Sequence, residues 1–174
     1  MTGDLKDQFA PSEQVSKHPE AQTIEDVMTF RLQRLVAIGE RAGDDWSQRL
    51  FDLSLNEWRL LALIQARSPS RAGDMADLLL MDKSQMSRVI KSLLGKGLIR
   101  SFPDPRDGRA LALEPTKAGV TLYSEVFEEV IRGNERVLDV LSEEEARMFN
   151  RTLDKLIAHS CDLLEARLGR RLVR

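Results

Sequence analysis

Apolar residues recur at intervals of three and four along much of the 174-residue chain, which is the pattern of amphipathic helices. The first such stripe predicts a helix over residues 23–42, with Thr23 and Asp26 as a cap-like start. The Gly-Asp-Asp sequence at 43–45 is expected to break this helix, because glycine and aspartate are poor helix formers. Residues 46–53 are then a short connection with at most one helical turn.

Three short helices are expected next, and polar pairs mark two of their beginnings. In a capping box, the side chain before a helix and the side chain three residues later satisfy each other's backbone N–H groups. Ser54 with Glu57 fits this arrangement, and Asp82 with Gln85 caps the third helix in the same way. The predicted helices extend from 54 to about 68, from 71 to 80 and from 82 to 94.

A β-hairpin and two more helices complete the pattern. Residues 98–102 and 109–113 predict two strands, joined by the turn-forming stretch 103–108 with its two prolines, two aspartates and glycine. A long apolar stripe then predicts a helix over 116–141, and a second capping box at Ser142 opens the last helix.

The order of these elements defines the expected organisation. Three short helices followed by a hairpin are the arrangement of a winged helix-turn-helix, so the fold class is mainly α, with long helices on either side. The low aromatic content of 5% also argues against a many-stranded sandwich. The expected parts are a flexible tail at 1–22, an N-terminal helix and connection at 23–53, the winged lobe at 54–115 and C-terminal helices at 116–174.

Composition narrows the cellular setting and the chemistry. A single cysteine, Cys161, cannot form an intrachain disulfide, which favours a reducing, cytoplasmic location. No apolar run approaches the ~20 residues that a membrane span needs, so no membrane is expected. His18 and His159 have no partners at metal-ligand spacing, so neither a metal nor another cofactor is expected.

The charged residues are distributed unevenly along the chain, so the net charge of the whole chain hides a local excess of basic residues. The 26 basic and 28 acidic residues give −2, which by itself argues against a nucleic-acid partner. Residues 83–109, however, hold seven basic and two acidic residues, a local charge of +5 that leaves −7 elsewhere. A small basic patch on an acidic body is an electrostatic signature of a polyanion-binding protein.

The predicted helix over 82–94 has the side chains for DNA recognition on one face. Glutamine and arginine can pair with adenine and guanine edges, whereas serine and lysine suit phosphates. A solvated helix face is the alternative for this helix alone, and the attached hairpin makes that alternative weaker. The predicted DNA contacts on this helix are Lys83, Ser84, Gln85, Ser87, Arg88 and Lys91.

These features closely resemble the MarR family of bacterial regulators over about residues 24–168. The resemblance is carried by the stretch 75–100 and, most specifically, by the Asp-x-Arg-Asp-x-Arg sequence that begins at Asp104. Pro115 stands where the family more often has leucine, a minor departure. Further matching residues are Leu111, Leu113, Thr116 and Gly119.

The resemblance implies a homodimer whose two recognition helices meet a palindromic DNA operator about 34 Å apart. It assigns Arg106 and Arg109 to DNA contacts from the hairpin wing, with Asp104 bracing an arginine so that it points at DNA. The sequence supports a dimer independently, because a 26-residue helix that is apolar along its full length needs a partner.

The resemblance also implies release from DNA by a small ligand, often an aromatic acid, bound between the dimer helices and the DNA-binding lobe. Aromatic rings and guanidinium groups would suit such a ligand, and the region that joins the lobes supplies both. The candidate residues are Arg34, Trp46, Trp58 and Arg59. The structural alternative for the tryptophans is a core or hinge position, and for the arginines it is a surface ion pair.

Two other classes of function compete with this one. A winged helix can bind a partner protein through the basic patch, and nothing in the sequence excludes this interaction module. An enzyme is not expected, because the chain lacks the nucleophile, metal-protease and phosphate-loop motifs. The preferred function is therefore a repressor that binds DNA and responds to a ligand.

Overall fold

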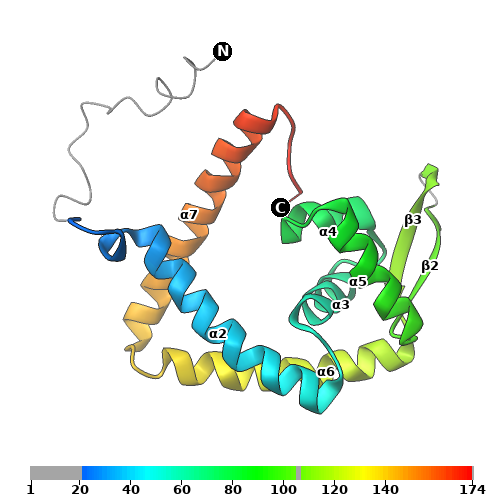
Figure 1. Ribbon diagram of the computed structural model, residues 1–174, viewed down its shortest axis with the longest axis horizontal. Coiled ribbons are helices and arrows are strands. Elements are labelled where there is room, and N and C mark those ends of the chain that lie inside the picture. The colour runs from blue at the N-terminus through cyan, green and yellow to red at the C-terminus, as the bar shows by residue number, and fades with distance from the viewer. Residues whose placement is uncertain (1–20, 105–106, 174) are drawn as a thin grey trace. The chain divides into compact units, whose positions relative to one another are not determined.

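The computed structural model describes residues 21–104 and 107–173, apart from the side chains at 44–45 and 107–109. Contacts group the chain into two units, one that ends at Gly43 and one that begins at Asp44. The expected tail at 1–22 lies almost entirely outside the described residues. The second unit holds the sheet and the buried core (Figure 1).

The first element is a short turn instead of the start of the predicted helix. Thr23 and Asp26 form the expected capping box, but it encloses the 3₁₀ helix η1 (Ile24–Asp26). The Asp26 carboxylate accepts hydrogen bonds from the backbone N–H groups of Gln22 and Thr23, at 3.0 and 2.8 Å. Val27 is then extended, so the cap closes a single turn before the long helix begins.

Helix α2 (Met28–Phe51) continues through the predicted break at 43–45, so that prediction is wrong. A glycine inside a helix costs only about 1 kcal/mol, which favourable packing can outweigh. The last turns of α2 supply that packing, because the Trp46 and Phe51 rings meet edge to face at 5.8 Å beside the core. The Ser47 hydroxyl donates to the Leu53 carbonyl at 2.8 Å and fixes the end of the helix.

The winged lobe has the predicted element order. Its strands reach further toward the hairpin tip than expected, which shortens the turn predicted over 103–108. Ladder pairing accounts for this extension, because β2 and β3 are paired from Ile99 opposite Pro115 to Asp104 opposite Asp107. The elements are α3 (Leu55–Ala66), α4 (Ala72–Leu79), α5 (Lys83–Gly95), β2 (Ile99–Asp104) and β3 (Asp107–Pro115).

A third strand joins the hairpin that the sequence predicted. Strand β1 (Ser70–Arg71) pairs antiparallel with β3, with Ser70 opposite Leu113 and Arg71 opposite Ala112. The sheet order is β1-β3-β2. Because two residues carry no periodic pattern, the sequence assigned Arg71 to the following helix, and α4 begins one residue later.

The core lies where the three short helices meet the sheet and the first half of α6 (Lys117–Leu138). Helix α6 ends three residues before the predicted 141, and α7 (Glu143–Leu168) begins at the predicted Ser142 capping box. The fully buried apolar side chains are Leu53, Leu60, Leu61, Ile64, Met75, Leu93, Leu113 and Val126.

A glycine allows α6 to leave the sheet at close range. The backbone N–H of Thr116 donates to the Leu98 carbonyl at 3.0 Å, and the Thr116 hydroxyl donates to the Gly97 carbonyl at 2.7 Å. A Cβ atom on Gly119 would lie 2.0 Å from the Leu98 carbonyl oxygen, closer than any real contact. Position 119 therefore excludes every other residue unless the strand and helix separate.

Replacing Gly119 by alanine should lower the free energy of unfolding by about 3 kcal/mol, because the added methyl group would push the backbone of α6 away from the Leu98 carbonyl. Urea denaturation followed by circular dichroism measures this change. Gly133→Ala is the matched control in the same helix, since its Cβ would meet nothing within 4 Å. It should stabilise the helix by up to about 1 kcal/mol. Equal effects of the two substitutions would contradict the close approach at Gly119.

Candidate nucleic-acid interface

Helix α5 turns its polar side chains to solvent along one face. On its other side, Met86 and Leu93 are buried, and Val89 and Ile90 pack partly buried against the core. This packing leaves the polar positions of the helix without any role in the core. All six predicted DNA contacts on the helix are exposed: Lys83, Ser84, Gln85, Ser87, Arg88 and Lys91.

The basic residues of the patch differ in whether another side chain pairs with them. Lys83, Arg88 and Lys91 form no ion pair with any described residue. By contrast, Lys96 pairs with the Glu57 carboxylate at 3.2 Å, and Arg100 pairs with Glu114 across the sheet at 2.7 Å. The seven basic residues counted from the sequence are therefore not equivalent: among those whose side chains the structure describes, the three on the face of α5 are the ones outside ion pairs.

The beginning of α5 is fixed by the predicted capping box. The Asp82 carboxylate accepts the backbone N–H of Gln85 at 2.8 Å, and the Gln85 side chain accepts the Asp82 N–H at a longer 3.4 Å. Gln85 thus has a structural contact as well as the predicted contact with a base. Its long, weak hydrogen bond is one that a base edge can replace at little cost.

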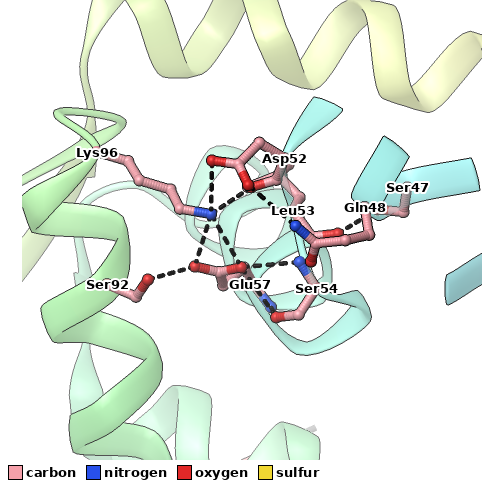
Figure 2. A network of polar contacts seen from close by, with 8 residues as sticks. All are labelled: Ser47, Gln48, Asp52, Leu53, Ser54, Glu57, Ser92 and Lys96. Atoms are coloured by element: carbon pink, nitrogen blue, oxygen red, sulfur yellow. Dashed lines mark hydrogen bonds and ion pairs between the residues drawn. The ribbon is translucent and has the colours of Figure 1, made fainter. Parts of the chain in front are cut away.

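A buried carboxylate sets the position of α5 against α3. Glu57 lies in the first turn of α3, where its Oε2 accepts the Ser54 backbone N–H and hydroxyl at 2.8 and 2.9 Å. Its Oε1 accepts the hydroxyl of Ser92 from α5, and Lys96 at the end of α5 approaches both oxygens at 3.2 and 3.3 Å (Figure 2). One side chain therefore caps one helix and anchors another.

Lys96 extends the same network to the end of α2. Its ammonium group donates to the backbone carbonyl of Asp52 and lies 3.5 Å from the Asp52 carboxylate. Asp52 has a left-handed backbone, with φ of 50°, which turns its carbonyl out of the helix that has just ended. The ends of α2 and α5 and the beginning of α3 therefore meet at one cluster of charges.

The surroundings of Glu57 keep it ionised. Burial alone raises the pKa of this carboxyl group, but the hydrogen bonds from Ser92, Ser54 and Lys96 together outweigh burial and hold the pKa below its ordinary value. The network is therefore built around the charged form of Glu57, and protonation would remove part of its strength.

Asp104, at the turn end of the hairpin, forms an ion pair with an arginine that the sequence did not single out. Asp104 is buried at the end of β2, and the guanidinium group of Arg71 on β1 donates to its carboxylate. The resemblance predicted that Asp104 braces an arginine of the wing. Arg106 lies outside the described residues, as does the side chain of Arg109, so these roles stay predictions.

The predicted ligand-binding tryptophans both pack against neighbouring rings. Trp58 is buried and stacks on Tyr123 at 5.6 Å, and Tyr123 stacks in turn on Phe127 at 5.3 Å. Trp46 contacts Phe51 as described above. These contacts give the tryptophans a structural role, which was the alternative considered from the sequence. A pattern of single aromatics could not reveal Tyr123 as the partner, because the stack joins α3 to α6.

The predicted ligand-binding arginines belong to different units. Arg34 lies in the first unit, along a groove of about 600 Å³ that is also lined by Asp26, Phe30 and Ile38. Arg59 is half-buried on α3 in the second unit. The set of four residues remains a prediction.

The described residues contain no cluster of three or more histidine, cysteine or carboxylate side chains that could hold a metal. Their one cysteine, Cys161, is a free thiol on α7. None of the helices in this described part is long and apolar enough to cross a membrane.

Residues 53–111 match the model of the MarR family. This stretch of the chain is similar to the MarR family. The match begins at Leu53, after the end of α2, and includes Glu57, the whole of α5 with Ser92, and the hairpin as far as Leu111. The resemblance to this family that the sequence indicated is therefore confirmed.

Known transcriptional regulators are similar to larger parts of the chain. The transcriptional regulator YxaD of Bacillus subtilis (strain 168), of HTH type and uncharacterised, is 29% identical over 133 residues, 76% of this chain and 90% of its own. The HTH-type transcriptional repressor IacR of Pseudomonas putida is 22% identical over 113 residues, 65% of this chain and 67% of its own. Solved structures confirm the expected fold class. One similar structure is the crystal structure of the S. aureus MepR–DNA complex, which matches this chain with a TM-score of 0.68 and 18% identity. The match covers 79% of this chain and 99% of that one.

Replacing Glu57 by glutamine should lower the free energy of unfolding at pH 7 by about 2 kcal/mol, because two helices lose hydrogen bonds to a charge. Glu145→Gln is the matched control, since Glu145 forms the same capping box with Ser142 at the exposed start of α7. Glu145→Gln should lower the free energy of unfolding by clearly less than Glu57→Gln does. Thermal and urea unfolding of the two variants measure the difference, and equal losses would contradict the anchoring role of Glu57.

The same variant has a defined pH dependence. Because the folded pKa of Glu57 is below its unfolded value, its stabilisation is complete above the ordinary glutamate pKa of about 4.3 and is lost as pH falls through the folded value. The stability gap between wild type and Glu57→Gln should therefore narrow below about pH 4. A gap that widens on acidification would contradict the ionised network.

Proposed function

We propose that this chain is a MarR-type transcriptional regulator that binds DNA as a homodimer and represses from a palindromic operator. The observation that carries the proposal is the exposed polar face of α5, where three cations lie unpaired among the described residues beside serines and a glutamine. The matched family and the two regulators described above support the same function. A cytoplasmic location and the absence of enzyme activity are parts of this proposal.

The face of α5 divides into two kinds of contact. Arg88 and Gln85 have side chains that can form paired hydrogen bonds to guanine and adenine edges in the major groove. Lys83, Lys91 and the serines suit phosphate oxygens, which set register and affinity without reading sequence. The acidic remainder of the chain would be repelled by DNA, so docking is restricted to the orientation that presents α5 and the wing.

The C-terminal helices support the homodimer. On α7 the residues Phe149, Leu156 and Leu163 follow one another at intervals of seven, and each remains substantially exposed in the single chain. Such a stripe is the pattern by which one helix packs along another. Exposed apolar residues continue on α6 at Ile131 and Val137. A second copy of the chain would cover this surface and bring two copies of α5 to one palindrome.

Release by a small aromatic acid is the remaining part of the proposal. It rests on the family resemblance and on the predicted residues Arg34, Trp46, Trp58 and Arg59. Trp58 on α3 stacks on Tyr123 of α6. A ligand that disturbed this stack would move α3, and with it Glu57, which anchors α5. No cofactor is required for this response.

Replacing Arg88 by alanine should weaken binding to a specific duplex by about tenfold or more, because one good base contact contributes about 1–3 kcal/mol. The probe is a duplex selected by the wild-type protein from a random-sequence library, with a scrambled duplex beside it, and fluorescence anisotropy gives the dissociation constants. Specificity should fall together with affinity, since Arg88 is assigned to a base edge.

The matched control for Arg88 is Arg147→Ala, which removes the same exposed charge from α7 and should leave DNA binding unchanged. Wild-type protein that selects no duplex and is not retained on DNA at low salt would refute the proposed function and favour the protein-interaction module. Selection of a duplex without any effect of Arg88→Ala would refute the assigned recognition face.

Replacing Leu163 by glutamate should convert the dimer into a monomer, because a charge would enter the apolar stripe of α7. Leu163 is 61% exposed in the single chain, so the folded monomer should keep its stability. Asn150→Glu introduces the same charge at an exposed polar position of the same helix and should leave the dimer intact. Sedimentation equilibrium, with a wild-type mass near twice 19.7 kDa, distinguishes these outcomes. A wild-type monomer would contradict the proposed assembly.

A further inference from the structure

The chain beyond α7 folds back and binds the helix-turn-helix. Gly169 ends α7 with a left-handed backbone, φ of 65°, which reverses the chain direction. The next residue, Arg170, donates from its two terminal nitrogens to the two carboxylate oxygens of Asp77 on α4, both at 2.8 Å. The backbone N–H of Leu172 donates to the Glu165 carboxylate at 2.8 Å, which holds the returning segment against α7. Figure 1 shows the C-terminal segment beside α4. We call residues 169–173 the C-terminal strap.

The contact between Arg170 and Asp77 is held by two hydrogen bonds and is more specific in its geometry than an ordinary surface ion pair. Two parallel N–H···O bonds between a guanidinium and a carboxylate fix orientation as well as distance. Asp77 is only 20% exposed, whereas Arg170 is 55% exposed. The pKa of Asp77 is lowered mainly by the hydrogen bonds from Arg170, with burial opposing, and the backbone N–H of Val173 adds to the lowering. Two residues of the strap therefore act on one carboxylate.

The strap joins parts of the molecule that have different tasks under the proposed function. Helix α4 is the first helix of the helix-turn-helix, and it is followed directly by the turn that leads into α5. Helix α7 carries the apolar stripe assigned to the dimer. A link between the end of α7 and the middle of α4 therefore connects the dimerisation helices with the lobe that meets DNA, over 93 residues of sequence.

We propose that Arg170 and Asp77 form a positioning pair, which holds the DNA-binding lobe at the end of α7 in the orientation that fits a two-half-site operator. This inference rests on the proposed function. A lobe that is held in place loses less conformational freedom when both half-sites are engaged, so the pair increases affinity for the full operator. A duplex with a single half-site binds one lobe, so its affinity does not depend on how the two lobes are spaced and should not change when the pair is removed.

Asp77→Asn gives the sharpest test, because electrostatics alone predicts the opposite sign. Removing a negative charge from the DNA-binding lobe would by itself strengthen binding to DNA. The positioning pair predicts weaker binding to the full operator, by about two- to fivefold, which is the range for one ion pair near the surface. The same variant should bind a half-site duplex as tightly as wild type or slightly more tightly.

Arg170→Gln should reproduce the loss on the full operator, and the double variant should lose no more than either single variant, because both remove the same contact. Arg171→Gln is the matched control, since it removes the same charge from the neighbouring residue and keeps the pair. It should leave the preference for the full operator unchanged. Anisotropy titrations use the library-selected duplex, its isolated half-site, and versions with one or two base pairs inserted between the half-sites.

The possible results distinguish a failure of the positioning pair from a failure of the proposed function. Reduced full-operator affinity for both single variants, with unchanged half-site binding and more tolerance of inserted base pairs, supports the positioning pair. Weaker binding of Arg170→Gln to full and half-site duplexes alike, without loss in Asp77→Asn, would show that Arg170 contacts DNA directly and would overturn it. Wild-type binding that neither variant changes overturns the pair alone, whereas wild type that binds neither duplex overturns the proposed function together with it.

Discussion

The buried carboxylate of Glu57 is the interaction on which the geometry of the lobe depends. It satisfies the start of α3, accepts a hydrogen bond from Ser92 on α5, and attracts Lys96, which in turn binds the end of α2 at Asp52. A charge taken out of water is costly unless it is fully paired. Here the pairing is complete, so the arrangement that satisfies Glu57 is also the one that fixes α5.

Two further close contacts complete the frame around this anchor. Gly119 lets α6 leave the sheet in direct contact with the Leu98 carbonyl, and Arg71 binds the buried Asp104 at the turn end of β2. Together with the apolar core, these contacts hold the helix-turn-helix and the hairpin as one body. Apart from the cap at Gln85, the exposed face of α5 takes no part in the packing, because the opposite face and the end of the helix make the packing contacts.

Electrostatics at this surface depends on which charges are already paired. The local excess of basic residues over 83–109 indicates a small basic patch, within which Lys96 and Arg100 are paired with Glu57 and Glu114. Among the basic side chains of this patch that the structure describes, those outside ion pairs lie on the polar face of α5. A protein of net charge −2 can therefore combine a local attraction for phosphates with general repulsion elsewhere, which restricts the orientations in which DNA can approach.

The sequence by itself determined the features that depend on neighbouring residues. The capping boxes at Ser54, Asp82 and Ser142, the order of helices and hairpin, and the polar face of α5 all follow from spacings of three to seven residues. Only the tertiary structure decided the continuation of α2 through 43–45, the strand β1, and the partners of Glu57 and Asp104. The strand and these partners depend on residues more than thirty positions apart, which packing brings together and no local pattern records, whereas α2 continues because its last turns pack beside the core. The capping role of Glu57 was thus readable in four residues, whereas its role as the anchor of α5 required the fold.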